Sequence, residues 1–203
     1  IVGFWHMDEP QWTGTTGEVK DETGVNHGTA KNGATITSDA EYGQAGYFDG
    51  EDDYVEVPDD DSLDITDEIT IEAWVRESNR KPSAKIVSRR VDNIFYFLGV
   101  DDGKPYGGIG DEADYDITDE TFTMPLNEWH HLVFVFVDDE DKGYIYYDGV
   151  LKETSAITSS IGDLFGVKLS IGADKEGTKN YFNGTIDELR IYNRALSPTE
   201  IQI

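Results

Sequence analysis

Short segments that alternate apolar and polar residues, each followed by a turn, recur along almost the whole chain. In residues 69–76 the apolar side chains fall at every second position, at Ile69, Ile71, Ala73 and Val75. A period of two is typical of a β-strand with one buried face. Residues 131–137 are apolar at successive positions, as in a central strand that is covered on both sides. This pattern predicts an all-β fold.

Turn signals divide the chain into further strands. Residues 138–143 form a polar turn, and Asp148-Gly149 is the dipeptide of a tight hairpin. Other predicted strands are 45–48, 54–57, 85–90, 93–100, 106–109, 167–171 and 185–192. Helix signals are limited to one short turn at residues 61–63 and another at 197–200. No linker or repeat divides the 203 residues, so we expect a single antiparallel β-sandwich domain over residues 1–203.

The charge balance is strongly acidic. The chain has 42 Asp and Glu against 16 Lys and Arg, a formal net charge of −26. Such a charge argues against nucleic acid and anionic membrane surfaces as partners. It is compatible with cation binding at acidic loops, with adaptation to high salt, or with plain solubility of an exported domain. No run of eighteen apolar residues is present, so we expect no membrane insertion, and without cysteine there is no disulfide framework.

Six blocks of sequence carry a family resemblance, in a consistent order. They are residues 48–58, 69–75, 127–133, 146–151, 171–174 and 184–201. The last block combines a strand that has an acidic pair near its start with Asn-Arg-Ala-Leu-Ser. Together the blocks resemble laminin G-like domains of the concanavalin A-like lectin/glucanase superfamily. The resemblance implies an antiparallel jelly roll that is extracellular or on the cell surface, often with bound calcium and often recognising carbohydrate.

A calcium site is expected where the two chain ends meet. Asp187 lies two and four residues before Leu189 and Ile191, so in a regular strand its side chain lies on the same face as theirs, toward the core. A carboxylate in that position needs a cation or several hydrogen bonds. Because the termini of jelly rolls commonly pair, residues 21–28 would lie close to it. We therefore predict Ca²⁺ ligands at Asp21, the Gly24 carbonyl, Asn26 and Asp187. The alternative is that backbone amides or an arginine satisfy Asp187 and that residues 21–28 form an ordinary turn.

A sugar-binding surface is expected in the middle of the chain, which combines aromatic rings with polar side chains. Sugars stack on such rings and hydrogen-bond to neighbouring polar groups. The predicted ligand-binding residues are Arg89, Arg90, Asp92, Tyr96, Tyr106 and Tyr115. The alternative is that many of these aromatic residues are core, as we expect for Trp74, Trp129, Phe134 and Phe136.

Catalysis is not predicted. Glycoside hydrolases of this broad fold use two carboxylates on one strand. Glu112 and Asp114 begin such a pattern, but the third acid, Asp116 or Asp119, falls at the wrong spacing. The chain is predicted to be a calcium-stabilised carbohydrate-recognition module of a larger secreted or surface protein. The alternatives are a structural or adhesive domain that contacts protein partners and, by fold analogy alone, a glycoside hydrolase or lyase.

Overall fold

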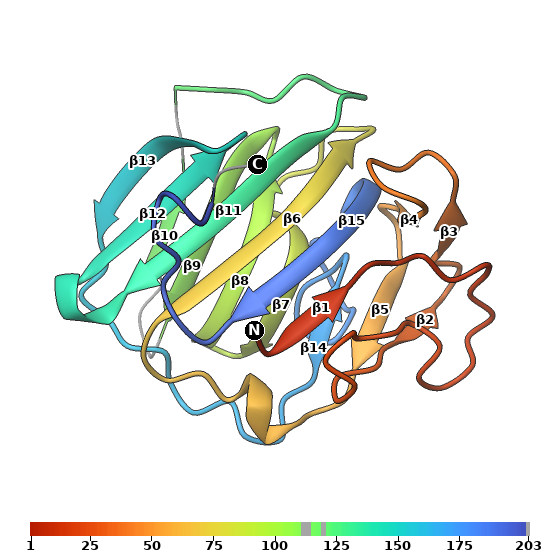
Figure 1. The fold of residues 1–203 in the computed structure, drawn as a ribbon, viewed down its shortest axis with the longest axis horizontal. Coiled ribbons are helices and arrows are strands. Elements are labelled where there is room, and N and C mark those ends of the chain that lie inside the picture. The colour runs from red at the N-terminus through yellow and green to blue at the C-terminus, as the bar shows by residue number, and fades with distance from the viewer. Residues whose placement is uncertain (111–114, 119–120, 202–203) are drawn as a thin grey trace.

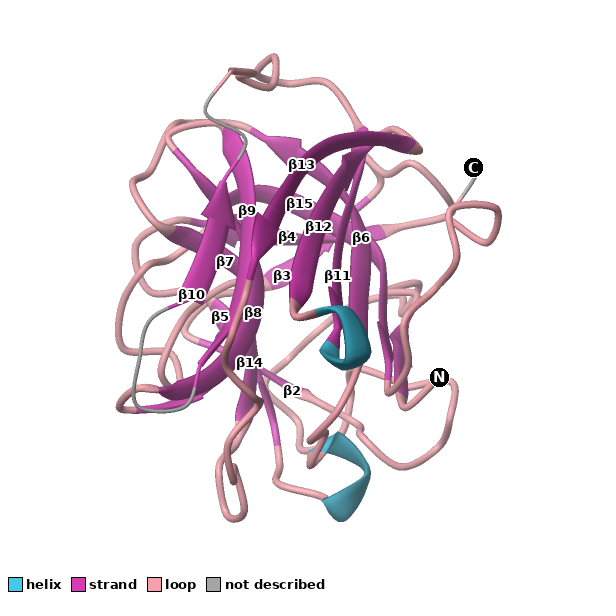
Figure 2. Cartoon of the chain, turned by 90° about the vertical axis from the view of Figure 1, so that its left-hand side faces the viewer, coloured by secondary structure: helices cyan, strands magenta, loops and turns pink. Residues whose placement is uncertain are grey.

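The computed structural model describes residues 1–110, 115–118 and 121–201, with residues 115 and 116 described by their backbone alone. Two antiparallel β-sheets face each other across an apolar core (Figures 1 and 2). The described residues contain no α-helix, only the 3₁₀ turns η1 (Asp61–Leu63) and η2 (Asp138–Glu140). The predicted all-β sandwich is confirmed. No helix in this described part has the length and hydropathy that a membrane span requires.

Sheet I has eight strands and carries the features discussed below. Seven of them follow the order β13 (Val150–Ala156), β12 (Lys142–Tyr147), β11 (His130–Val137), β6 (Ile69–Glu77), β15 (Asn183–Tyr192), β4 (Ala45–Asp49) and β3 (Thr35–Thr37). The eighth, β1 (Gly3–Trp5), also pairs with β15, so the first and last strands of the chain lie side by side (Figure 1).

Sheet II has seven strands and covers the other side of the core. Its order is β10 (Tyr115–Thr118), β9 (Lys104–Gly110), β8 (Ile94–Asp101), β7 (Ala84–Val91), β14 (Leu169–Ile171), β5 (Tyr54–Val57) and β2 (Thr29–Lys31). Seen from the side, β6, β11 and β12 form one layer and β7, β8 and β9 the other (Figure 2).

The core is built by the inward positions of both sheets, as the period of two predicts. All four apolar residues of the alternation in β6 are fully buried. Phe134 and Phe136 on β11 are also fully buried, as expected. The sheets approach closely at Gly107 on β9, where a Cβ atom would lie 2.5 Å from Cγ of Phe134. Each fully buried side chain of this size contributes roughly 1.5–3 kcal/mol through the hydrophobic effect.

Strand β15 contains a β-bulge that decides the orientation of its acidic pair. Asp187 lies opposite Trp74 and Arg190 lies opposite Glu72, so β15 has one residue more than β6 in this interval. The extra residue is accommodated at Glu188, whose φ is 51°. Because directly opposed residues share a face, Asp187 lies on the outer side of sheet I with Trp74. The predicted core-side orientation of Asp187 is therefore wrong, since it assumed an uninterrupted strand.

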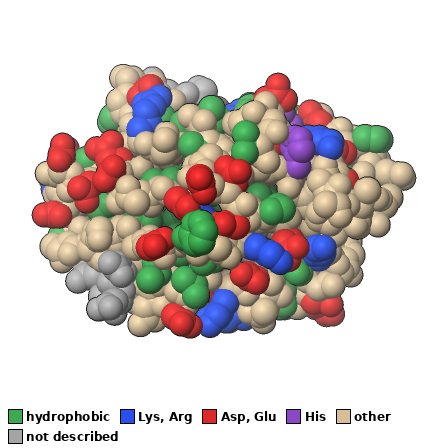
Figure 3. Space-filling model, turned by 90° about the horizontal axis from the view of Figure 1, so that it is seen from below, with side chains coloured by type: hydrophobic (Ala, Val, Ile, Leu, Met, Phe, Trp, Pro, Cys, Tyr) green, Lys and Arg blue, Asp and Glu red, His purple; other side chains and the backbone are tan. Residues whose placement is uncertain are grey.

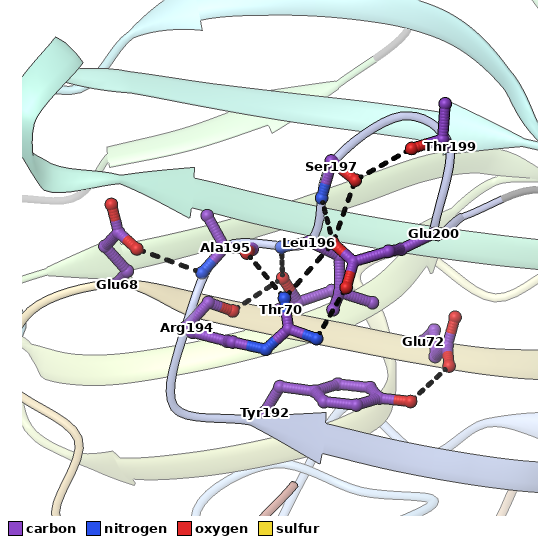
Figure 4. Close-up of polar contacts among 10 residues, drawn as sticks. All are labelled: Glu68, Thr70, Glu72, Tyr192, Arg194, Ala195, Leu196, Ser197, Thr199 and Glu200. Carbon is purple, nitrogen blue, oxygen red and sulfur yellow. Dashed lines mark hydrogen bonds and ion pairs between the residues drawn. The ribbon is translucent and has the colours of Figure 1, made fainter.

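The segment after β15 crosses the outer face of sheet I. Here Thr70 Oγ1 donates to the Arg194 carbonyl at 2.9 Å and accepts from the Leu196 amide at 2.9 Å (Figure 4). Arg194 and Glu200 close the segment with two hydrogen bonds of 3.2 and 2.8 Å. The predicted helical turn at 197–200 is a hydrogen-bonded turn rather than a helix. This C-terminal segment (residues 193–201) separates two hollows on the outer face.

Candidate functional site

The first hollow lies where β6, β11 and β15 run side by side on the outer face of sheet I. It has a volume of about 230 Å³ and combines aromatic rings with charged groups. We call it the Trp74 hollow, and it is lined by Tyr42, Glu72, Trp74, His131, Arg190, Glu200 and Ile201. The strands are rigid supports, and only Tyr42 and the last two residues come from loops.

Two aromatic side chains give this hollow an apolar wall. Trp74 is half-buried, and Tyr42 is 51% exposed. Their rings meet edge to face, with centroids 6.1 Å apart and an interplanar angle of 78°. On the other side of Trp74, the His131 ring lies with its centroid at 5.5 Å. Exposed ring edges and faces of this kind contact the apolar side of a bound ligand.

Glu72 is the centre of the charged part of the hollow. His131 Nε2 lies 3.3 Å and Arg190 Nη1 lies 3.4 Å from its carboxylate oxygens, and the Tyr192 hydroxyl donates to it at 3.0 Å. Burial raises the pKa of Glu72, but the hydrogen bond and charge of His131, together with Arg190 and Tyr192, outweigh it and hold the pKa below the ordinary value. Glu72 is therefore a fixed carboxylate.

Arg190 extends this network toward the N-terminal strand. Its guanidinium pairs with Glu188, and Glu188 in turn lies 2.5 Å from Nδ1 of His6. The same guanidinium stacks on the Phe4 ring, 4.2 Å from the centroid. The guanidinium is thus held by Glu72 and Glu188 and remains about a quarter exposed, so it is a fixed positive group in the lining of the hollow.

Asp187 lies beneath the loop that carries Tyr42. It is fully buried, and its Oδ2 accepts from the amides of Glu41 and Tyr42 at 3.1 and 2.8 Å. Among the described residues its Oδ1 has no hydrogen-bond partner. Burial raises the pKa of Asp187 to about 7, and the charges of Glu188 and Asp8 add to the shift, whereas hydrogen bonds from the amides of Tyr42 and Glu188 oppose it. The alternative stated above, that backbone amides bind Asp187, is thus confirmed for one of its two oxygens.

Asp8 holds the other side of the same loop. Its Oδ1 accepts from the Gln44 amide at 2.7 Å, and a Cβ atom on Gly43 would lie 2.1 Å from that oxygen. The carboxylates of Asp8 and Asp187 thus accept hydrogen bonds from the backbone of residues 41–44, and Asp187 has one further oxygen that is buried. Carboxylate oxygens are the ligands that hard divalent cations prefer, so Asp8 and Asp187 are residues here that could hold such an ion.

The other predicted calcium ligands have different partners. Asp21 and Asn26 do come together, since the Asn26 amide donates to Asp21 at 2.8 Å. Asp21 also accepts from the amides of Phe4, Thr23 and Val25 and from the Thr23 hydroxyl, which uses its lone pairs within the loop. Gly24 has a φ of 84°, as its turn requires. None of the contacts of this loop involves Asp187, which is bound instead by residues 41–42.

Two residues predicted to bind a sugar lie inside the protein. Arg89 and Tyr96 are both fully buried between the sheets. Arg89 pairs with Asp59 and Asp64 at 2.5 and 2.7 Å, and Tyr96 donates to the Leu63 carbonyl. These residues anchor loops to sheet II and have no surface for a ligand, so their predicted role is corrected. Side chains alternate between the two faces of a strand, and Arg89 on β7 and Tyr96 on β8 occupy positions that point toward the core.

The remaining predicted sugar ligands are on or beside the outer face of sheet II. Arg90 lines a hollow of about 530 Å³ together with Phe165, which is 74% exposed. Asp92 is exposed and pairs with Lys175 at 3.3 Å. Tyr106 is 4% exposed, with the Lys85 ammonium above its ring. Arg90 and Tyr106 are linked on this face by two rings, since Arg90 stacks on Phe95, Phe95 contacts Phe97 and Phe97 contacts Tyr106. The Tyr115 side chain, like residues 112 and 114 of the acidic pattern, lies outside the described part.

The second hollow of sheet I lies on the other side of the C-terminal segment. It has a volume of about 530 Å³ and a largely apolar lining, formed by Val135, Val137, Tyr144, Tyr146, Leu151, Ala195, Leu196 and Pro198 with Glu68 and Glu140. Leu151 is 47% exposed, and it lies on β13, which is an edge strand of the sheet.

Trp74 is the main site residue that sequence reasoning assigned wrongly. It was expected in the core, yet it lies on the outer face with Glu72. The alternation that puts Ile71 and Ala73 inside also puts Glu72 and Trp74 outside, so the signal was present in the sequence. Trp129 is likewise half-buried rather than core. Tyr42 had no signal, since it lies in a loop whose partner, Asp187, is 145 residues away.

Comparison with known proteins gives a family and several structural neighbours. Residues 49–202 match the model of a family described as the concanavalin A-like lectin/glucanases superfamily. An 84-residue stretch is 34% identical to human adhesion G-protein coupled receptor D1 and covers 40% of this chain but only 9% of that receptor.

Two solved structures are similar over much of their length. Domain 4 of AbnA, an extracellular arabinanase from Geobacillus stearothermophilus solved with arabinotriose, has a TM-score of 0.78 at 21% identity, covering 98% of this chain and 95% of that one. The carbohydrate-binding domain CBM40 of a Ruminococcus gnavus sialidase, solved with sialyllactose, has a TM-score of 0.59 at 15% identity, covering 67% and 80%. At these identities the similarity concerns the fold.

Proposed function

Because the chain belongs to the concanavalin A-like lectin/glucanases superfamily, we propose that it is a carbohydrate-binding module that provides recognition within a larger secreted or surface protein. The observation that carries this proposal is the Trp74 hollow, where exposed rings lie beside fixed charged groups. Arabinotriose and sialyllactose in the two structural neighbours support a saccharide as the ligand class. We propose no catalytic role for Glu72, since ion pairs already engage its carboxylate.

In the proposed mode of binding, a sugar ring packs on the apolar wall formed by Trp74 and Tyr42. Its hydroxyl groups then hydrogen-bond to the guanidinium of Arg190 and to the carboxylate of Glu72. Prepositioned groups lower the entropy cost of association, and the ion pairs of this hollow fix its polar side chains in advance. Binding would therefore depend on the rings for contact area and on the network for orientation.

A glycan screen followed by single substitutions tests the proposal. Wild-type protein in calcium is expected to bind at least one neutral or acidic glycan, and Trp74→Ala is expected to weaken that binding by about tenfold or more, because the largest contact surface is lost. Tyr47→Ala is the matched control: Tyr47 is 39% exposed on the same sheet and lines neither hollow. Phe165→Ala tests the rival hollow beside Arg90.

Two results would contradict this assignment. A clean negative screen at both low and high salt would remove carbohydrate binding altogether. Binding that survives Trp74→Ala and Tyr42→Ala but is lost in Phe165→Ala would retain the function and move the site to sheet II.

We further propose that Ca²⁺ stabilises the module at Asp187 and Asp8. Both carboxylates are bound to residues 41–44, and the free Oδ1 of Asp187 is a suitable ligand atom. A cation there would hold the loop that carries Tyr42, so calcium would support sugar binding without touching the sugar. We retain the extracellular location as part of the proposal, since millimolar Ca²⁺ is available there.

Chelation tests the calcium proposal. EDTA is expected to lower the melting temperature of wild-type protein, and Asp8→Asn is expected to reduce that sensitivity. Asp21→Asn is expected to leave the sensitivity to EDTA unchanged. A reduced sensitivity in that variant would favour the ligand set predicted from the sequence. A melting temperature that EDTA leaves unchanged, in protein whose calcium content has been measured, would contradict a stabilising ion.

An adhesive role is the second candidate function, favoured by the apolar hollow beside β13. Exposed Leu151 on an edge strand next to this hollow provides a surface that a protein partner could cover. If the glycan screen is negative and cells that display the domain adhere to a protein-coated surface, Leu151→Asp should abolish that adhesion.

A further inference from the structure

A second group of carboxylates lies at the turn between β4 and β5, away from both hollows. Asp49 ends β4, and Asp52 and Asp53 precede β5. One carboxylate oxygen from each of the three lies within 4.8 Å of the others. Calcium–oxygen bonds are about 2.3–2.6 Å long, so oxygens on opposite sides of one ion are about 5 Å apart. The three groups are thus close enough to share an ion.

The hydrogen bonds of the turn engage only one carboxylate oxygen of Asp49 and one of Asp53. Asp49 Oδ1 accepts from the amides of Glu51 and Asp52 at 2.7 and 3.4 Å, and Asp53 Oδ2 accepts from the Asp49 amide at 3.0 Å. These bonds form the turn and fix the positions of Asp49 and Asp53. The second oxygen of each residue remains available.

The available oxygen of Asp53 is buried. Asp53 is only 3% exposed, and no residue that the structure describes forms a hydrogen bond to its Oδ1. This oxygen points toward Gly33, where a Cβ atom would lie only 2.9 Å away. A buried carboxylate oxygen without a partner is costly, because it has lost its water and gained nothing in return.

The ion pairs between described residues include none at Asp49, Asp52 or Asp53. The Lys81 side chain does pass this turn, since its Cε lies 3.1 Å from the place of a Cβ on Gly50. Burial raises the pKa of Asp53, and the charges of Asp49 and Asp52 raise it further, against the hydrogen bond from the Asp49 amide. Three acids at one turn thus repel one another where a single ligand could neutralise them.

We propose that Asp49, Asp52 and Asp53 form a second divalent-cation site, with Ca²⁺ as the fitting ion. Hard carboxylate oxygens are the ligands that calcium prefers, and the free oxygen of Asp53 would become a buried ligand. The site is separate from Asp187. Asp49 pairs with Asn183, four residues before Asp187 on β15, which corresponds to about 13 Å along the strand.

Calcium titration by calorimetry, with Tb³⁺ luminescence as a local probe, tests this site. Tyr54 follows Asp53 directly and can sensitise a bound Tb³⁺ ion. Asp52→Asn is the main variant, because Asp52 is exposed and its side chain forms no bond on which the turn depends. Glu51→Gln is the matched control, an exposed acid in the same turn that lies outside the group.

The expected result is that Asp52→Asn weakens one class of calcium site at least tenfold, whereas Glu51→Gln leaves it unchanged. In an Asp8→Asn background, which disables the other proposed site, the remaining isotherm should still respond to Asp52→Asn. An isotherm that is the same in wild type and Asp52→Asn, or no calcium binding at millimolar concentration, would overturn the inference. Either result is independent of whether the module binds a sugar.

Discussion

Glu72 illustrates how a single residue of the hollow contributes to stability while it also belongs to the proposed recognition site. Its pKa is lower than that of an ordinary glutamate because His131, Arg190 and Tyr192 outweigh the effect of burial. A carboxyl group whose pKa is depressed in the folded state stabilises that state fully above its unfolded pKa of about 4.5. This stabilisation is lost as the pH falls through the lower, folded value.

We therefore expect Glu72→Gln to lower the free energy of unfolding at pH 7 by about 2 kcal/mol. The difference between wild type and variant should shrink as the pH falls from about 4.5 through the lower pKa of folded Glu72, below which both side chains are neutral. Urea unfolding at each pH measures it. Glu22→Gln, an exposed control, should behave as wild type, and a difference that stays constant down to pH 2 would argue against a depressed pKa.

Residue-level prediction from the sequence succeeded where the strand was regular and failed where it was not. The alternation in β6 assigned the buried face correctly. The same alternation places Trp74 on the outer face, but Trp74 was predicted to be core because tryptophan is usually buried. For Asp187 the rule itself did not apply, because the bulge at Glu188 shifts the parity of everything before it. A bulge is set by pairing with another strand, which a single segment does not reveal.

At the level of elements, strands with an apolar pattern of their own were predictable, including the short β5 and β14, and strands without one were not. Strands β6, β8, β11 and β15 have their own apolar pattern, whereas β1 and β3 have three residues each and exist because a longer partner pairs with them. The candidate site depends on such long-range contacts, since Tyr42 reaches Trp74 from a loop. Its location therefore could not be derived from local patterns.

The C-terminal segment provides a test at this level. Leu196 is 7% exposed and packs with Val133, Val135 and Tyr146 on the outer face of sheet I. We expect Leu196→Ala to lower the free energy of unfolding by about 2–3 kcal/mol, through lost burial and a residual cavity. Thr199→Ala, an exposed change in the same segment, should cost less than about 0.5 kcal/mol. Equal losses in both variants would mean that the segment is not held by its apolar contacts.

The whole molecule carries an unbalanced negative charge. With a net charge of −26, acidic side chains are spread over the surface, as on the face seen in Figure 3, rather than gathered in one block. Self-repulsion of such a surface disfavours the compact state, and salt screens it.

We expect the stability to rise when sodium chloride is raised from 0.05 to 1 M at a constant, saturating calcium concentration. A gain of about 1 kcal/mol would appear as an increase of roughly 2–4 °C in the melting temperature of a domain of this size. Calorimetry measures it. A flat or falling melting temperature would mean that local ion pairs, such as Arg89 with Asp59, already compensate the charge.

The bulge in β15 has a consequence for how related sequences diverge. Because Glu188 is the extra residue, a homologue that lacks it would keep Asp187 opposite Trp74 and Arg190 opposite Glu72 in a regular strand. A homologue that keeps all four residues but pairs them without a bulge would instead turn Asp187 to the core side. The pairing of Asp187 with Trp74 is thus a better criterion for inheritance of this arrangement than the identity of any residue between Asp187 and Arg190.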